Sequence, residues 1–157
     1  MKTIGIDPGV TGAIVLLDND NPIEWIRMPT MKVGSATRVN GSELANSISN
    51  WDLYGDVKHA FIEQVGAMPG QGVSSMFNFG HSAGTVMGVI SAIGIPYTLV
   101  TPQAWKKRAG LIGLDKDAAR TRAIQLWPRW TDLGAKDRKS TRLNSSHTDI
   151  SRMPSSA

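Results

Sequence analysis

The stretch that decides the fold is IGIDPGVTGA at residues 4–13, an apolar strand pattern that ends on Asp7 and runs into a turn rich in Pro and Gly. Proline and glycine supply the backbone geometry of tight turns. A second apolar run at residues 13–17 and an alternating run at residues 23–28 follow. We therefore expect residues 3–7 and these two runs to open the domain as a three-stranded antiparallel meander.

The rest of the chain alternates between helical and strand patterns. Ser42 can cap a helix, and Gly or Pro residues separate the later elements. The patterns predict four helices: one from residue 42, one over 73–93, one around 105–108 that follows Thr101 and Pro102, and one from Asp115 to residue 126. They also predict strands at 60–63 and 97–100. The order βββαβαβα, with one more helix, indicates an α/β fold with a mixed sheet flanked by helices.

Charge is unevenly distributed along the sequence. The whole chain has a formal net charge of +4. Residues 1–100 contain five Lys and Arg against eight Asp and Glu, whereas residues 101–136 contain eight against three. A basic segment beside an acidic one suits a nuclease that uses metal ions, because phosphates are attracted while carboxylates hold the ions. An ordinary solvated helix face explains the same charges equally well.

The sequence contains no cysteine, so disulfides and thiolate metal sites are excluded. Any bound metal must use oxygen or imidazole ligands, which makes a hard cation such as Mg²⁺ the natural candidate. The apolar runs are short, and the N-terminus leads directly into a strand pattern rather than a cleavable signal. We therefore expect a soluble cytoplasmic protein without a membrane segment.

Two carboxylates stand at the ends of predicted strands. Asp7 ends the first strand, and Glu63 ends the run at residues 60–63 before a glycine-rich loop. Two acids at neighbouring strand ends repel each other unless a cation lies between them, so a shared metal explains both. The alternatives are that Asp7 only organises its turn and that Glu63 is an incidental exposed acid.

Three segments together resemble the signature blocks of the RuvC-like Holliday junction resolvases, especially the phage type. They are IGIDPGVTGA at 4–13, FIEQVGAMPGQGVSSMFNFG at 61–80 and TPQAWKKRAGLIGLDKDAAR at 101–120. The resemblance implies an RNase H-like fold, a homodimer, and action on branched DNA, above all on four-way junctions. It also implies two-metal hydrolysis of phosphodiesters by Mg²⁺, with Mn²⁺ as an alternative, held by four acids or by three acids and a His.

Carried onto this sequence, the resemblance assigns the first two metal ligands to Asp7 and Glu63. The last two belong to a late acidic helix, where Asp137 matches a third ligand. From residue 137 the sequence turns to Ser, Thr, Arg and Asn without apolar periodicity, and it resembles an adaptor-derived tail that recurs on unrelated translated sequences. We therefore expect a nuclease domain at 1–136 and a disordered or artefactual tail at 137–157. The last helix of the fold and the fourth metal ligand are then expected to be missing. A chain with these parts missing should have poor nuclease activity.

The resemblance also points to residues that contact DNA. The basic candidates, which lie in or beside the block that resembles the family's DNA-binding lysines, are Lys106, Lys107, Lys116, Arg120 and Arg122. The apolar candidates, which follow the second strand-end acid and could wedge against unstacked bases, are Met68, Phe77 and Phe79. Ordinary solvated charge is the alternative for the first group, and core packing is the alternative for the second.

Three glycines, Gly80, Gly84 and Gly88, recur on one face of the predicted helix at 73–93. This helix resembles the family's dimer interface, so we expect homodimerisation through it, with packing on the protein's own sheet as the alternative. A two-fold dimer suits a four-way junction, which needs two matched cuts. His59 and His81 lack the spacing of metal ligands, and we assign them no role.

Two other functions are compatible with parts of the sequence. The order strand, Asp, Gly, Thr, Gly at residues 4–12 also resembles the first phosphate loop of actin-like and sugar-kinase-like domains, but the sequence has no second copy of this motif. A DNA-junction-binding domain without catalysis would suit the missing fourth acid. The two strand-end acids favour the nuclease.

Overall fold

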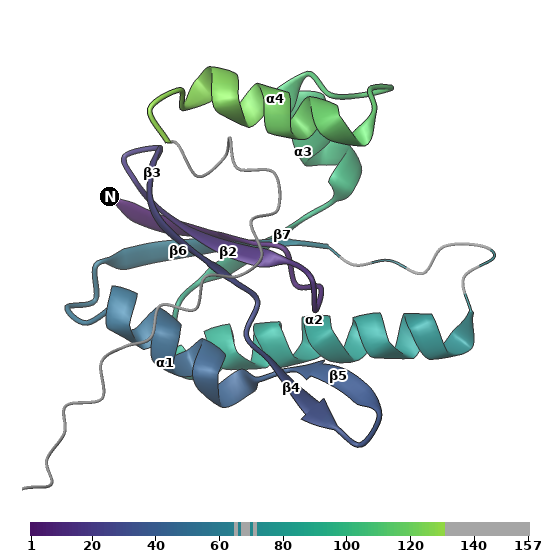
Figure 1. The fold of residues 1–157 in the computed structure, drawn as a ribbon. Helices are drawn as coiled ribbons and strands as arrows, with labels where there is room; N and C mark the ends of the chain where they lie inside the picture. The colour runs from purple at the N-terminus through teal and green to yellow at the C-terminus, as the bar shows by residue number, and fades with distance from the viewer. Residues whose placement is uncertain (65, 67–69, 71, 131–157) are drawn as a thin grey trace, which may run out of the picture.

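A five-stranded mixed sheet forms the centre of the computed structural model, which describes residues 1–130 except 65, 67–69 and 71. The strand order is β3-β2-β1-β6-β7 (Figure 1). The strands are β1 Lys2–Ile6, β2 Ala13–Asp18, β3 Asn21–Arg27, β6 Val57–Glu63 and β7 Tyr97–Val100. β1, β2 and β3 pair antiparallel, whereas β6 and β7 run parallel to β1. The expected opening meander and the mixed-sheet α/β fold class are confirmed.

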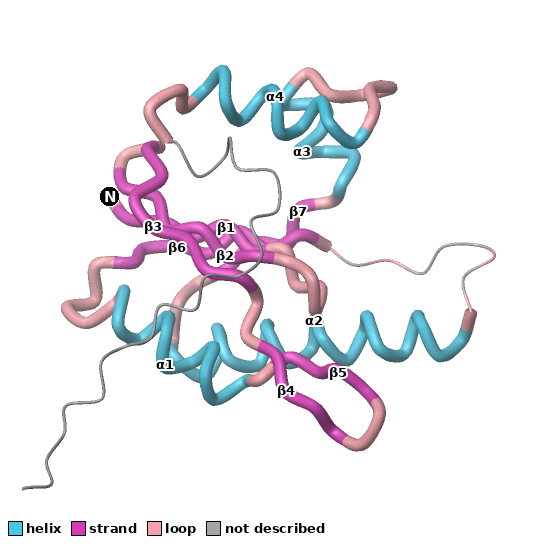
Figure 2. The backbone as a smooth tube through the Cα atoms, viewed as in Figure 1, coloured by secondary structure: helices cyan, strands magenta, loops and turns pink. Residues whose placement is uncertain are grey.

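Helices flank the sheet on both sides, as Figures 1 and 2 show. Helices α1 (Gly41–Trp51) and α2 (Val73–Ile93) lie on one face, and α3 (Pro102–Ala109) and α4 (Lys116–Leu126) lie on the other. The sheet therefore has two helices on each face, and the 21-residue α2 is the longest of the four.

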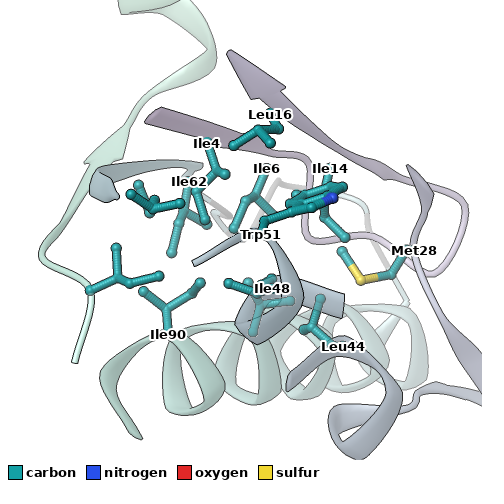
Figure 3. Packing of buried hydrophobic residues seen from close by; sticks show 14 of the residues in the cluster. Ile4, Ile6, Ile14, Leu16, Met28, Leu44, Ile48, Trp51, Ile62 and Ile90 are labelled. Carbon is teal, nitrogen blue, oxygen red and sulfur yellow. The ribbon is translucent and has the colours of Figure 1, made fainter. Parts of the chain in front are cut away.

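The main core lies between the sheet and the pair α1 and α2 (Figure 3). Alternate strand residues point to the same face of a sheet, so β1, β2 and β6 each send alternate side chains into this layer. The fully buried members of the core include Ile4, Ile14, Leu44, Ile48, Ile62, Val86 and Ile90. Each such side chain contributes about 1.5–3 kcal/mol by leaving water.

A short hairpin of β4 (Thr30–Val33) and β5 (Ala36–Val39) forms a second sheet that the sequence patterns did not predict. All four residues of β4 are exposed, so the apolar alternation that marks a half-buried strand is absent. The hairpin lies beside α2 (Figure 2), and the Arg38 guanidinium donates a hydrogen bond to the Asn78 side chain on that helix.

Polar side chains cap the starts of α1, α3 and α4. Asp115 caps α4 as predicted, and its side chain accepts a hydrogen bond from a backbone N–H of the first turn. Helix α3 starts after Thr101 as predicted, and the structure adds that the Thr101 side chain caps it in the same way. The prediction that Ser42 caps α1 was wrong. Asn40 occupies that position, and its Oδ1 accepts from the Glu43 N–H at 3.2 Å. Asn and Ser are about equally good caps, so composition alone did not separate them.

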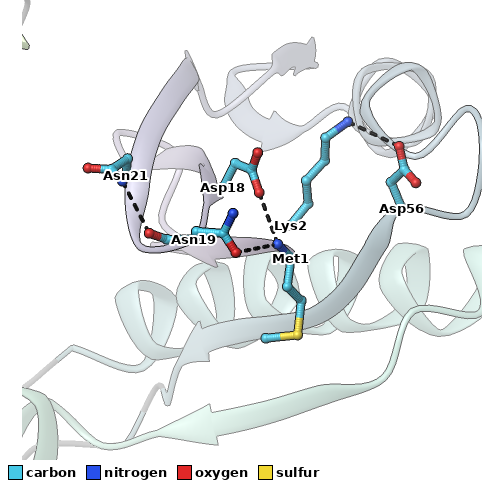
Figure 4. A network of polar contacts seen from close by, with 6 residues as sticks. All are labelled: Met1, Lys2, Asp18, Asn19, Asn21 and Asp56. Atoms are coloured by element: carbon cyan, nitrogen blue, oxygen red, sulfur yellow. Dashed lines mark hydrogen bonds and ion pairs between the residues drawn. The ribbon is translucent and has the colours of Figure 1, made fainter.

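Ion pairs hold the N-terminus at the side of the sheet where β1 begins, opposite the carboxyl ends of β1 and β6 (Figure 4). The Met1 amino group lies 3.0 Å from Asp18 Oδ1, and Lys2 Nζ lies 3.3 Å from Asp56 Oδ2. Both pairs are solvent-exposed, and such ion pairs contribute about 0–1 kcal/mol each. They hold the start of β1 against neighbouring strands.

Several predictions fall on residues outside the described part of the chain. They are the domain boundary at residue 136, the tail at 137–157, the third metal ligand Asp137 and the apolar DNA contact Met68. These stay predictions.

Candidate functional site

The carboxyl ends of β1 and β6 bring the two predicted acids to one edge of the sheet. The strands are parallel neighbours, and Ile6 pairs with Ile62, so Asp7 and Glu63 are the next residues on adjacent strands. Ile6 and Ile62 are buried toward α1 and α2. Because successive side chains point to opposite faces, the two carboxylates project on the side of α3.

Backbone groups fix Asp7 at the start of its turn. Its N–H donates to the Ala13 carbonyl at 3.0 Å, and its Oδ1 accepts from the Gly9 N–H at 3.1 Å. A side chain at Gly12 is excluded, because a Cβ there would lie 2.2 Å from the Asp7 carbonyl oxygen and 2.8 Å from Asp7 Cγ. Asp7 thus does organise the turn, and this leaves its Oδ2 free of any partner among the described residues, so the turn does not account for the whole carboxylate.

A hydrogen bond from α3 holds the Glu63 carboxylate. Trp105 Nε1 donates to Glu63 Oε1 at 2.8 Å, across 42 residues of sequence. No other hydrogen bond or ion pair to this carboxylate is formed within the described residues, so Oε2 is free of them. Glu63 is therefore oriented by a specific donor and is not an incidental surface acid.

The two carboxylates line one pocket of about 750 Å³ between the sheet edge and α3. Its lining residues are Ile6, Asp7, Phe61, Ile62, Glu63, Val100, Ala104, Trp105 and Arg108. The walls are mainly apolar, with two acids, one indole N–H donor and one guanidinium. A pocket with apolar walls and few convergent polar groups is the usual form of a ligand site.

The donor set fits a hard divalent cation in part. Each acid keeps one oxygen of its carboxylate unpartnered within the described residues, and carboxylate oxygen is the preferred ligand of Mg²⁺. In the part of the chain that the structure covers, no third Asp, Glu, His or Cys completes a cluster with them. Mg²⁺ is often bound by one or two carboxylates together with substrate phosphate and water, so two acids suffice for a substrate-assisted site.

Helix α3 places positive charge around this pocket. Lys106 and Lys107 are exposed, and Lys106 Nζ lies 5.6 Å from the centre of the Trp105 ring. Arg108 lines the pocket itself, a residue that the sequence reasoning did not single out. It forms no ion pair with the described residues, so its guanidinium is available to an anion.

The other predicted basic residues lie on the next helix. Arg120 is partly buried in α4, Arg122 is exposed and contacts Gln125 at 3.4 Å, and Lys116 begins the helix. Arg120 and Arg122 are not among the described residues that line the carboxylate pocket. Any contact that these two residues make with DNA lies outside that pocket.

The aromatic candidates sit at the start of α2. Phe77 is 64% exposed, and the Arg38 guanidinium lies 5.7 Å from the centre of its ring. Core packing is therefore wrong for Phe77. Phe79 is half-buried beside the turn that follows Asp7, because a Cβ built on Gly9 would lie 3.6 Å from Phe79 Cε2.

The glycine stripe of α2 faces open space. Gly80, Gly84 and Gly88 are exposed, and a Cβ built on any of them meets no atom within 4 Å. The alternative that these glycines pack on the protein's own sheet is wrong. The stripe lies on an uncovered face of a 21-residue helix that contains no Asp, Glu, Lys or Arg. Even so, no helix in the described part of the chain has the length and apolar character needed to cross a membrane.

Comparison with known proteins identifies the fold. No model of a known protein family matches the sequence, and no curated protein matches it. A solved structure of T. thermophilus RuvC in complex with a Holliday junction substrate is similar, with a TM-score of 0.58 and 14% identity, over 87% of this chain and 82% of that chain. A second Thermus thermophilus RuvC structure gives a TM-score of 0.50 at the same identity and coverage. The protein therefore has a RuvC-like, RNase H-like fold.

Proposed function

We propose that this protein is a divalent-metal-dependent endonuclease that resolves four-way DNA junctions by paired phosphodiester hydrolysis. The observation that carries the proposal is the pair of strand-end carboxylates, Asp7 and Glu63, which share one pocket with Arg108, whose guanidinium forms no ion pair within the described residues. A site that hydrolyses phosphodiesters needs acids that hold a metal ion and positive charge that meets the phosphate. The similar RuvC structure holds a Holliday junction substrate, which supports branched DNA as the substrate class.

The roles of the residues follow from their positions. Asp7 and Glu63 would hold Mg²⁺ or Mn²⁺ through the oxygens that have no partner in the described residues, with Asp137 as the proposed third ligand. The bound cation supplies charge that makes a phosphodiester reactive toward water. Phe61 and Val100 form part of the apolar wall beside the two acids.

Positive residues around the pocket would bind the DNA backbone. Arg108 is placed to contact the phosphate nearest the acids, and Lys106 and Lys107 extend the basic surface along α3. Lys116 and Arg120 on α4, Phe77 on α2, and Met68 are proposed contacts to other parts of the junction. A nuclease that acts on such DNA would work in the cytoplasm of a bacterial or phage-infected cell.

We also propose that the protein acts as a homodimer through the glycine stripe of α2. An uncovered helix face without charged residues is the kind of surface that a second subunit covers. The absence of side chains at Gly80, Gly84 and Gly88 permits close backbone approach. Two-fold symmetry would then place two pockets on one junction, as paired cuts require.

A non-catalytic junction-binding domain is the second candidate, and one observation favours it. Within the described residues only Asp7 and Glu63 converge, without a third ligand. No observation on the described residues favours the nucleotide-binding alternative.

Strand nicking tests the proposal against that second candidate. A labelled four-way junction is incubated with excess protein and Mg²⁺ or Mn²⁺, beside the variants Asp7→Asn and Glu63→Gln. We expect slow nicking, because only two acids meet in the pocket within the described residues, and we expect both variants to lose it. Binding without nicking at any Mn²⁺ concentration would reject the nuclease and leave the binding domain.

A further inference from the structure

One tryptophan joins the carboxylate pocket to the basic helix. Trp105 lies on α3 and is half-buried, and its Nε1 donates to Glu63 Oε1 at 2.8 Å. An indole N–H can only donate, so this contact fixes which carboxylate oxygen is engaged. The ring also lies under the Lys106 ammonium, at 5.6 Å from its centre. The indole is thus held between a cation and a carboxylate.

The local sequence explains why Trp105 reaches the pocket. Thr101 caps α3 and Pro102 begins it, which sets the helix direction directly after β7. Ala104, Trp105 and Arg108 all line the pocket, and Arg108 lies four residues after Ala104 and three after Trp105, the spacings that bring helical side chains to one face. Gln64 N–H donates to the Val100 carbonyl at 2.8 Å, so the strand that ends on Glu63 and the strand that leads into α3 are joined beside the contact.

We infer that Trp105 is a positioning residue for the metal site, a role that rests on the proposed function. Its N–H holds Oε1 of Glu63 and leaves Oε2, which has no partner among the described residues, for a cation in the pocket that Asp7 also lines. A charged acceptor strengthens such a hydrogen bond, and a carboxylate held in one rotamer loses less entropy when it binds a cation. Partners that orient a metal ligand in this way typically change metal affinity by about 10–100-fold.

The test measures Mn²⁺ binding by calorimetry on the full chain, without DNA. Trp105→Phe removes the donor, and replacement of Trp105 by benzothienylalanine removes only the N–H while keeping the size and shape of the indole. Trp127→Phe is the matched control, because Trp127 Nε1 also donates a hydrogen bond, to the Asp20 carbonyl at 2.9 Å, outside the carboxylate pocket. Glu63→Ala, alone and combined with Trp105→Phe, completes a double-mutant cycle.

We expect both replacements at Trp105 to weaken Mn²⁺ binding about tenfold, with Trp127→Phe at the wild-type affinity. In the Glu63→Ala background, Trp105→Phe should change nothing further, since the group that it positions is gone. Wild-type affinity in the benzothienylalanine protein, or an equal further loss in the Glu63→Ala background, would overturn the positioning role. If Glu63→Ala itself leaves Mn²⁺ binding unchanged, the proposed metal site fails instead.

Discussion

At the residue scale, the Asp7 carboxylate depends on the absence of a side chain at Gly12. The turn between β1 and β2 folds Gly12 onto Asp7, and the Gly12 N–H donates to the Gly9 carbonyl at 2.9 Å. The acid is therefore aimed by a loop that tolerates no Cβ at one position. Glycine is used here for close approach of backbone to backbone.

Gly12→Ala should displace Asp7 and destabilise the protein by about 1–3 kcal/mol, because the methyl group would overlap the Asp7 backbone. Urea unfolding measures the stability, and Mn²⁺ calorimetry measures the site. Gly9→Ala is the matched control, since its Cβ would make ordinary contacts of 3.4 Å or more and the N–H that holds Asp7 Oδ1 is retained. Equal effects of the two substitutions would contradict this account of the turn.

Among the residues of the pocket, the sequence predicts the two acids but not the residues from α3. Asp7 and Glu63 were predicted because an apolar run that ends on an acid marks a strand end, and parallel neighbours share an edge of a sheet. Trp105 and Arg108 could not be assigned to the pocket in the same way. Their roles depend on how α3 turns back over β6, a tertiary arrangement that has no local signal in the sequence.

At the element scale, the start of α1 follows from one side chain. Asn40→Ala should lower the free energy of unfolding by about 1 kcal/mol, because the Glu43 N–H loses its acceptor. Ser42→Ala, at the exposed position first predicted to be the cap, should change it by less than about 0.5 kcal/mol. Thermal unfolding of the two variants compares them directly, and a larger loss at Ser42 would reverse the correction.

Helix α3 carries the proposed DNA backbone contacts, and their signature is salt dependence. Lys106→Met and Arg108→Met should each reduce the slope of log Kd for DNA against log salt by about 1, because each removes one phosphate contact. Lys58→Met is the control, as Lys58 lies near the start of β6 and donates to the Gly55 carbonyl. Fluorescence anisotropy over a salt series gives the slopes. Unchanged slopes for both α3 variants would show these residues to be ordinary surface charges.

The hairpin β4–β5 marks the limit of prediction at this scale. Its strands are short and β4 is fully exposed, so pairing across a tight turn at Gly34, rather than burial, defines it. Long elements with a buried face, such as β1 and α2, were predicted close to their observed bounds. The apolar run at 97–100 was also predicted as a strand although three of the four residues of β7 are exposed, so it is the lack of an apolar pattern in β4, and not exposure alone, that hid the hairpin.

At the scale of the whole molecule, the uncovered face of α2 predicts self-association. Gly84→Arg should convert a dimer into a monomer, because a long charged side chain would fill the space that a second subunit needs. Ser49→Arg adds the same charge at an exposed position of α1 and should leave the dimer intact. Light scattering after gel filtration gives the masses. A monomeric wild-type protein would remove the proposed dimer and its symmetric pair of sites.

The central claim is that the pocket of Asp7 and Glu63 cuts branched DNA in matched pairs, and mapping of the cut positions tests it most directly. Each strand of a four-way junction is labelled in turn and incubated with the wild-type chain and Mn²⁺ under single-turnover conditions. We predict slow nicks at symmetric positions in two opposite strands, absent with Asp7→Asn and Glu63→Gln. Nicks scattered over all four strands, or nicks that persist in both variants, would contradict the claim.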